Sequence, residues 1–162
     1  FVDRTKGRAD TFFTHDLGLG VQHLSAAHPY CETMRKVAVE KCRELGIPVH
    51  DGGTVVTIQG PRFSTTAESE WFQKMGWSVV NMTQYPEAWL ARELGMHYVN
   101  VSLVTDYDSG LGKYAAVTND DVLRVFNENL HLLRKLIEAM VPALPATIDD
   151  DCTGSATLFD RL

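Results

Sequence analysis

Three short polar segments hold the side chains best suited to bind or transform a small molecule. They are residues 60–64 (GPRFS), 81–83 (NMT) and 105–108 (TDYD). In the third segment, Asp106 and Asp108 stand two positions apart. At a buried strand end, such a pair can serve as general acid and hydrogen-bond acceptor, because each negative charge favours the protonated form of the other. The alternative interpretation is a solvated acidic loop or a helix cap.

Each polar segment follows or ends a run that predicts a β-strand. The runs are 54–59 (TVVTIQ), 78–82 (SVVNM) and 98–105, where Val99, Val101 and Leu103 alternate with Asn100 and Ser102. Residues 1–4 predict the end of a further strand. In α/β sheets ligands gather beyond the carboxyl ends of the strands, so the convergence of the three polar segments predicts a small-molecule site.

Four segments between and after these runs predict helices. They are 32–45, a helix capped by Thr65 or Thr66 and ending at Met75, a short helix from Pro86 to Leu94, and a long helix capped by Thr118. The predicted inner stripe of the long helix is Val122, Phe126, Leu130, Leu133, Ile137 and Met140. This alternation predicts an α/β fold, a mixed central sheet flanked by helices on both faces. We expect residues 1–142 to form the C-terminal part of a single domain and residues 143–162 a tail.

Composition excludes several classes of protein. The net charge of −6 argues against a nucleic-acid or anionic-membrane surface. No apolar run of this sequence reaches membrane-spanning length, and we expect no signal peptide from its residues. Cys31, Cys42 and Cys152 match no disulfide framework or zinc pattern, which favours free thiols in a reducing cytoplasm and no metal site. The chain begins at Phe1 without an initiator methionine, so we expect a fragment or a processed piece.

The order and spacing of the segments resemble the methylthioadenosine phosphorylase branch of the purine nucleoside phosphorylase family. The similarity extends over nearly all of residues 1–140. The similar segments are 1–5 (FVDRT), 23–31, 53–64 (GTVVTIQGPRFS), 67–69 (AES), 81–83 (NMT) with 86–87 and 90–91, and 105–108 (TDYD). The resemblance implies a nucleoside phosphorylase-like fold, here as a partial domain. The implied reaction is phosphorolysis, in which phosphate attacks the anomeric carbon of a ribosyl group and the purine leaves.

The resemblance assigns the purine contacts. It implies that Asp106 gives or shares a proton with the purine near N7, and that Asp108 accepts a hydrogen bond from a 6-amino group. Phe63 is implied to pack against the purine face. Relatives that prefer 6-oxopurines typically carry Asn at the position of Asp106 and Glu at that of Ser64. The present residues therefore favour adenine.

The sugar and phosphate contacts are implied for the second segment. Met82 is similar to the residue that lies against the ribose, and Thr83 to a phosphate ligand that uses its hydroxyl and amide. Asn81 lines the pocket or satisfies backbone groups. On sequence alone, a threonine after a strand is more often a plain helix cap.

The 5′ end of the substrate is implied to meet other residues. His23 resembles a residue lent to the pocket of a neighbouring subunit. Val122 and Leu123 resemble the apolar lining for a methylthio group, although periodicity alone makes them core residues of the long helix. Asn119 departs from the valine usual at its position, and its amide can accept a 5′-hydroxyl group.

The resemblance further implies a cytoplasmic homotrimer that uses inorganic phosphate as a co-substrate and needs no cofactor. An N-terminal segment of the same protein, with a glycine-rich loop and an Arg-His pair, is implied to complete the phosphate site. We therefore expect cleavage of 5′-methylthioadenosine to adenine and 5-methylthioribose-1-phosphate. Two alternatives stay open: a broader or 6-oxopurine-type purine nucleoside phosphorylase, and a nucleoside-binding module without turnover.

Overall fold

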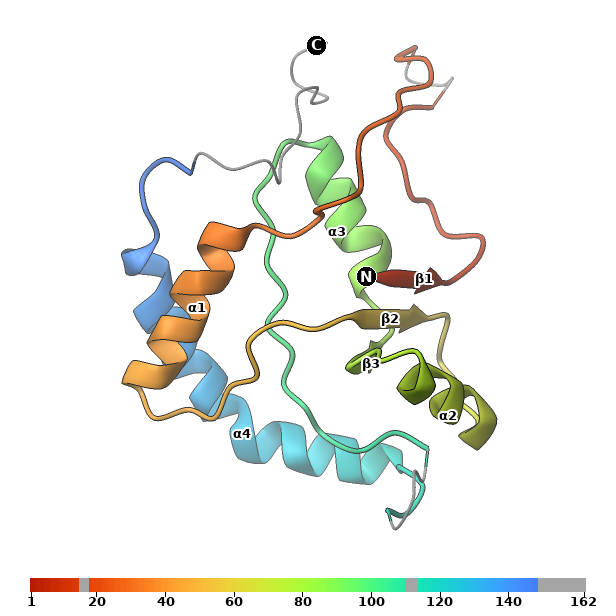
Figure 1. The fold of residues 1–162 in the computed structure, drawn as a ribbon, viewed down its shortest axis with the longest axis vertical. Helices are drawn as coiled ribbons and strands as arrows, with labels where there is room; N and C mark the ends of the chain where they lie inside the picture. Colours follow the sequence, from red (N-terminus) through yellow and green to blue (C-terminus); the bar gives the residue numbers. More distant parts are fainter. Residues whose placement is uncertain (15–17, 110–113, 149–162) are drawn as a thin grey trace.

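The computed structural model describes residues 1–14, 18–109 and 114–148, and within them it contains a three-stranded parallel sheet with helices around it (Figure 1). The elements are β1 (Val2–Arg4), α1 (Glu32–Glu44), β2 (Val55–Ile58), α2 (Thr66–Lys74), β3 (Val79–Asn81), α3 (Gln84–Glu93), α4 (Asn119–Met140) and the short 3₁₀ helix η2 (Val141–Ala143). The sheet order is β1-β2-β3, so β2 is central. Its sequence VVTI is β-branched throughout and its first three residues are buried, as a central strand requires.

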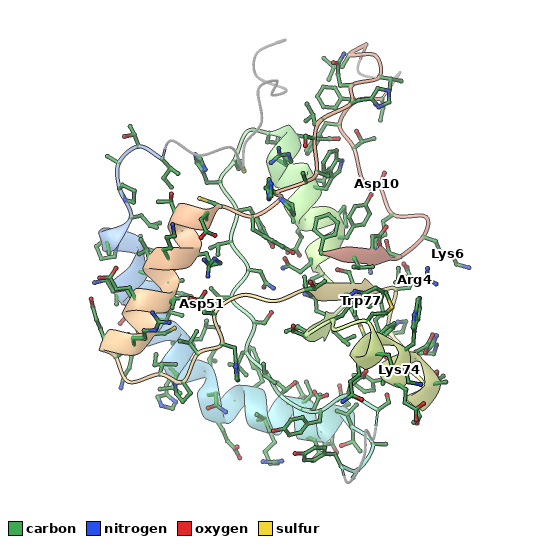
Figure 2. All side chains as sticks on the ribbon, in the orientation of Figure 1. Arg4, Lys6, Asp10, Asp51, Lys74 and Trp77 are labelled. Carbon is green, nitrogen blue, oxygen red and sulfur yellow. The ribbon has the colours of Figure 1, made fainter. Side chains whose placement is uncertain are left out.

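Helices cover both faces of this sheet. Side chains alternate between the faces along a strand, so Phe1 and Arg4 at the start of the chain point to opposite faces. Arg4 lies 5.2 Å over the ring of Trp71 in α2, whereas the ring of Phe1 lies 5.7 Å from that of Tyr85 in α3. Figure 2 likewise shows Arg4 near Trp77 and Lys74 on the α2 side and Asp10 on the α3 side. The predicted α/β class with helices on both faces is confirmed.

The pairing of the named strands is parallel throughout. Antiparallel pairing occurs among the described residues as an isolated bridge between Ser109 and Ala116. The predicted strands at 1–4, 54–59 and 78–82 are confirmed with slightly shorter bounds. The four predicted helices are confirmed as well. Thr65 caps α2 in a reciprocal capping box with Glu68, and Thr118 caps α4.

A separate apolar cluster joins α1 to the C-terminal half of α4. Ala38 and Cys42 of α1 pack there against Leu136 and Met140 of α4. The predicted inner stripe is therefore partly wrong. Phe126 and Ile137 are exposed, because α1 covers only the face of α4 that presents Leu136 and Met140.

The strand predicted for residues 98–105 is wrong. This segment is extended, and it runs between α1 and the sheet (Figure 1), but it has no strand partner among the described residues. Val99 packs against the α1–α4 cluster, while Val101 and Val104 are exposed. A strand is defined by its ladder of hydrogen bonds, and alternation of side chains alone does not supply a neighbour.

Two remaining predictions concern cysteines and membrane insertion. Cys31 and Cys42 are buried and form no disulfide within the described residues, whereas Cys152 lies outside them, as does most of the predicted tail, residues 149–162. Residues 110–113, before α4, lie outside the described residues too. Among the helices that the structure describes, none is long and apolar enough to cross a bilayer.

Candidate functional site

The carboxyl ends of β2 and β3 lie side by side and are in direct contact. Thr57 of β2 is paired in register with Asn81 of β3, and both strands turn into polar segments within three residues. Gly60 has a φ of 66°, and a Cβ atom at this position would overlap the side chain of Met82. The positive φ favours glycine at position 60, and a larger residue would also force the side chain of Met82 to move.

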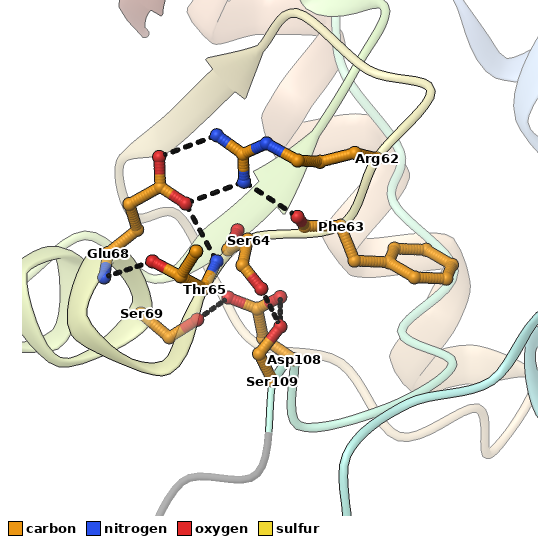
Figure 3. A network of polar contacts seen from close by, with 8 residues as sticks. All are labelled: Arg62, Phe63, Ser64, Thr65, Glu68, Ser69, Asp108 and Ser109. Atoms are coloured by element: carbon orange, nitrogen blue, oxygen red, sulfur yellow. Dashed lines mark hydrogen bonds and ion pairs between the residues drawn. The ribbon is translucent and has the colours of Figure 1, made fainter.

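The acidic loop after residue 104 docks on the segment that links β2 to α2 (Figure 3). The hydroxyl of Ser69, in α2, donates to Asp108 Oδ2, and the hydroxyl of Ser109 donates to the Ser64 carbonyl oxygen. Thr66 Oγ1 donates to the Ser109 carbonyl oxygen at 3.2 Å. Two of the three polar segments predicted to converge are thus brought together.

The two carboxylates are held in a tight turn. Asp106 Oδ1 accepts the backbone N–H of Asp108 at 2.8 Å, and Asp106 Oδ2 accepts the hydroxyl of Thr105 at 2.6 Å. Asp108 has a φ of 56°, in the left-handed region that aspartate tolerates better than most residues. Both side chains are half-buried and each carboxylate oxygen has a second lone pair, so the pair can still accept hydrogen bonds from a ligand.

Ser64 and Phe63 lie beside this turn. Ser64 is 6% exposed, and its hydroxyl has no hydrogen-bond partner among the described residues. A buried hydroxyl without a partner is costly, so Ser64 Oγ has an unmet capacity to donate and accept hydrogen bonds. Phe63 is partly exposed, and its ring points away from the polar network in Figure 3.

Hydrogen bonds to a charged carboxylate hold the segment that links β2 to α2, residues 59–65. Arg62 donates to both carboxylate oxygens of Glu68, at 2.7 and 2.8 Å, and the backbone N–H of Thr65 donates to the same carboxylate at 2.7 Å. The Arg62 bonds, followed by the Thr65 bond, lower the pKa of Glu68 to about 2. The carboxylate of Glu68 therefore stays charged and holds residues 62–65 in one conformation at neutral pH.

The second polar segment opens α3. Asn81 Oδ1 faces the backbone N–H groups of Thr83 and Gln84, each at 3.4 Å, so Asn81 satisfies backbone groups, one of its two predicted roles. Thr83 is at the cap position of α3, but its side chain makes no capping bond and is exposed. Met82 contacts the end of β2, as described above.

The start of α4 is linked to the acidic loop through the Ser109–Ala116 bridge. Asn119 is exposed there and Val122 is half-buried. Leu123 is 51% exposed, so the interpretation of this residue as core is wrong. The described residues therefore cover Val122 only in part and leave Leu123 largely exposed.

His23 is not brought to the other candidates within this chain. It is exposed, on the long connection between β1 and α1. That connection projects from the sheet on the side far from the first turns of α4 in Figure 1. Within the described residues, His23 therefore lies apart from the candidate site of its own chain.

A shallow surface hollow of about 440 Å³ lies elsewhere, along α1. Its lining residues are Lys36, Val39, Glu40, Arg43, Glu44 and Asp51. None of them is a predicted site residue, and exposed ion pairs such as Arg43–Asp51 account for part of its charge. The chemistry suggested by the sequence is at the strand ends and not in this hollow.

Sequence reasoning missed three residues at the strand ends. Ser69 and Ser109 hold the acidic loop, and Arg8 donates to backbone carbonyls at the ends of β2 and β3. The available signal was the unpaired carbonyl groups that any parallel sheet presents at its carboxyl edge, which require a donor. Arg8 is a cation that follows β1 by four residues and can supply such a donor, although the sequence does not indicate which carbonyl groups it meets.

Comparison with known proteins identifies the family. The sequence profile of the phosphorylase superfamily matches residues 1–142. The chain belongs to the phosphorylase superfamily. It is 45% identical to a purine nucleoside phosphorylase of Streptomyces coelicolor over 98% of this chain and 58% of the relative. It is 52% identical to an S-methyl-5′-thioadenosine phosphorylase of Mycobacterium tuberculosis over 86% of this chain and 50% of the relative.

Solved structures of the superfamily have the same fold. A methylthioadenosine phosphorylase of Schistosoma mansoni in complex with adenine superposes with a TM-score of 0.83 at 34% identity, covering 91% of this chain and 58% of that one. The same enzyme in complex with tubercidin gives a TM-score of 0.80. The nucleoside phosphorylase-like fold is confirmed. The chain spans little more than half the length of these superfamily members.

Proposed function

We propose that this chain forms the purine- and sugar-binding part of an enzyme that cleaves 5′-methylthioadenosine with phosphate, giving adenine and 5-methylthioribose-1-phosphate. The observation that carries the proposal is the docking of the Asp106–Asp108 turn onto the link that holds Ser64. It gathers two carboxylates and an unpartnered buried hydroxyl at one strand end. The names of the relatives from Mycobacterium tuberculosis and Schistosoma mansoni support the same substrate.

The proposed chemistry assigns one task to each group. An oxygen of phosphate attacks the anomeric carbon, the bond from that carbon to purine N9 breaks, and its electron pair goes to the purine. Asp106 gives its proton to N7, so the purine leaves neutral. Asp108 accepts a hydrogen bond from the 6-amino group, and Ser64 and Phe63 complete the base pocket. A 6-oxo group at this position would place its acceptor oxygen against the acceptor oxygen of Asp108, and no hydrogen bond could form between them.

Met82 and Thr83 hold the other reactants in this proposal. Met82 lies against the ribose. Thr83 binds phosphate through its exposed hydroxyl and its amide, at a helix N-terminus whose backbone N–H groups favour anions. The Thr83 amide exchanges its long 3.4 Å contact with Asn81 Oδ1 for the phosphate. Phosphate is a co-substrate, and we propose no cofactor and no metal.

The 5′ pocket and the assembly extend the proposal. Val122 and Leu123 line the methylthio pocket in this proposal, since the half-buried Val122 and the exposed Leu123 lie at the start of α4, which the Ser109–Ala116 bridge links to the acidic loop. His23 reaches the pocket of a neighbouring subunit in a homotrimer, which agrees with its place on a projecting connection. An N-terminal segment supplies the remaining phosphate ligands. Cys31 and Cys42 are thiols outside any disulfide among the described residues, which suits a cytoplasmic enzyme.

Steady-state rates with 5′-methylthioadenosine, adenosine and inosine, measured on the intact protein with saturating phosphate, test this function. We expect kcat/KM to be highest for methylthioadenosine and at least 100-fold lower for inosine, because Asp108 meets the 6-oxo group with an acceptor. A preference for inosine would overturn the roles given to Asp106 and Asp108. Binding of adenine without turnover of any nucleoside would indicate a binding module.

A broader purine nucleoside phosphorylase is the second candidate. Asn119 favours it, because an exposed amide at the start of α4 can accept a 5′-hydroxyl group. The name of the relative from Streptomyces coelicolor agrees with it. Adenosine cleaved as fast as methylthioadenosine would support this candidate, and Asn119→Val should then restore the preference for methylthioadenosine.

A further inference from the structure

Arg8 makes an unusual set of contacts at the carboxyl edge of the sheet. Its Nη1 donates to the carbonyl oxygens of Met82, at 2.9 Å, and Tyr85. Its Nη2 donates to the carbonyl oxygens of Gln59, at 2.9 Å, and Ile58, at 3.4 Å. Every partner that the described residues offer to this guanidinium is a backbone oxygen. The contacts join the end of β2 to the turn between β3 and α3.

The residues on both sides of Arg8 also contact the carboxyl edge of the sheet. The backbone N–H of Lys6 donates to the side chain of Gln59 at 3.1 Å. On the other side of Arg8, the hydroxyl of Tyr85 donates to Asp10 at 2.6 Å. Residues 6–10 are therefore fixed to both strand ends, with the guanidinium between them.

The position of these carbonyls relates Arg8 to the proposed reaction. The Met82 and Tyr85 carbonyls flank Thr83, the proposed phosphate ligand, and Met82 is the proposed ribose contact. Gln59 directly precedes Gly60, at the start of the link that leads to Phe63 and Ser64. A planar cation with five N–H groups can bond to several carbonyls at fixed angles, which the point charge of a lysine cannot reproduce.

We propose that Arg8 is a positioning residue, which sets the sugar- and phosphate-binding turn at residues 82–85 in register with the purine-binding segment after β2. This inference rests on the function proposed above. Reactant alignment is demanding, and a displacement near 1 Å costs rate on the order of 100-fold. Loss of Arg8 therefore acts on turnover more than on binding of the base, which meets the acidic loop and Ser64.

The test uses Arg8→Lys and Arg8→Met in the intact protein, with Arg35→Lys as the matched control. Arg35 pairs with Glu32 on α1, remote from the sheet edge. We expect Arg8→Lys to lower kcat by about 10- to 100-fold while the Kd for adenine changes by less than about 3-fold. Arg8→Met should lose at least as much, and Arg35→Lys should match the parent in both quantities.

Amide hydrogen exchange gives a readout that does not depend on turnover. In Arg8→Lys, the amides of Met82, Thr83, Gln84 and Tyr85 should exchange faster, while those of α1 do not change. Unchanged exchange together with kcat within 2-fold of the parent would overturn the proposal. Parallel loss of kcat, adenine binding and folded fraction would also overturn it, as a purely structural role. If the parent protein itself is inactive, the proposed function is refuted. The role of Arg8 is still tested in that case, by the amide hydrogen exchange of residues 82–85.

Discussion

The α1–α4 pair and the carboxyl edge of the sheet are held together by different forces. The two helices meet through apolar side chains around Leu136 and Met140. At the sheet edge, by contrast, the segments meet through hydrogen bonds: Arg8 with backbone carbonyls, and Ser69 and Ser109 with the acidic loop. Apolar burial is non-directional and stabilises the fold, whereas hydrogen bonds fix particular atoms in particular places. The comparison predicts that core variants change stability and edge variants change activity.

Asp106→Ala should show the largest effect at the edge. If Asp106 is the general acid, kcat falls by about 100- to 10,000-fold, while the Kd for adenine rises far less. The free energy of unfolding, measured with urea, should stay within about 1 kcal/mol of the parent because the side chain is only half-buried.

Asp106→Asn separates catalysis from shape. The amide oxygen can still accept the Asp108 N–H, which keeps the turn, but the side chain can no longer deliver an acidic proton. We expect turnover with methylthioadenosine to stay low in this variant. Restored turnover would mean that Asp106 only shapes the loop, and equal losses of kcat and adenine affinity in Asp106→Ala would mean that it only binds.

Leu136→Ala should show the largest effect in the core. Leu136 is 3% exposed, and removal of a buried leucine costs about 2–5 kcal/mol of unfolding free energy. Ile137→Ala, one position along, is the matched control, since Ile137 is 50% exposed and should cost less than about 1 kcal/mol. Urea unfolding measures both, and kcat per folded molecule should match the parent. The reverse order of the two variants would restore the stripe predicted from sequence.

The elements were predictable from sequence where local chemistry decides them. Thr65 and Thr118 are cap residues with acidic residues in the first turn, and both helices begin where these signals stand. The β-branched run of β2 likewise predicts a buried central strand. The strand predicted for residues 98–105 was wrong because a ladder needs a second strand, and alternation carries no information about a neighbour.

The sequence predicted which segments form the candidate site, but not which residues hold those segments in place. The rule that ligands gather at strand ends, together with the family resemblance, led to residues 60–64, 81–83 and 105–108. The contacts of Ser69 with Asp108 and of Arg8 with Met82 span 39 and 74 positions. No local pattern encodes such distant pairs. The buried face predicted for α4 was partly wrong for a related reason. Periodicity identifies an apolar face that includes Ile137, but it does not indicate where α1 crosses α4, and that crossing buries Leu136 instead.

Ser69→Ala should have a smaller effect, confined to the edge. The serine is buried and its hydroxyl donates to Asp108 Oδ2, so its removal leaves a carboxylate oxygen short of a donor. We expect the Kd for adenine, measured by calorimetry, to rise by about 10-fold, which corresponds to about 1.4 kcal/mol. Ser102→Ala is the control, since Ser102 is exposed and bonds only to Asn100 among the described residues. An unchanged Kd for adenine in Ser69→Ala would separate Asp108 from base recognition.

Glu68 tests whether the edge also contributes to stability, with the smallest expected effect. Its pKa in the folded chain is about 2, below the value of 4.5 expected for an unperturbed glutamate, because Arg62 and then Thr65 donate to the carboxylate. Its contribution is therefore complete above pH 4.5 and is lost as the pH falls from 4.5 towards 2. The carboxylate is partly exposed, so solvent limits this contribution to within about 1 kcal/mol.

Urea unfolding of the parent and of Glu68→Gln at pH 7 and pH 3 measures this contribution. The difference between the two proteins should be largest at pH 7 and should shrink at pH 3, because Glu68 of the unfolded parent is then protonated while Glu68 of the folded parent is still mostly charged. Glu128→Gln is the control, since Glu128 forms only an exposed pair with Arg124 on α4. A difference that does not change with pH would show that Glu68 acts through the shape of its hydrogen bonds alone. The link between β2 and α2 would then owe its conformation to geometry and not to charge.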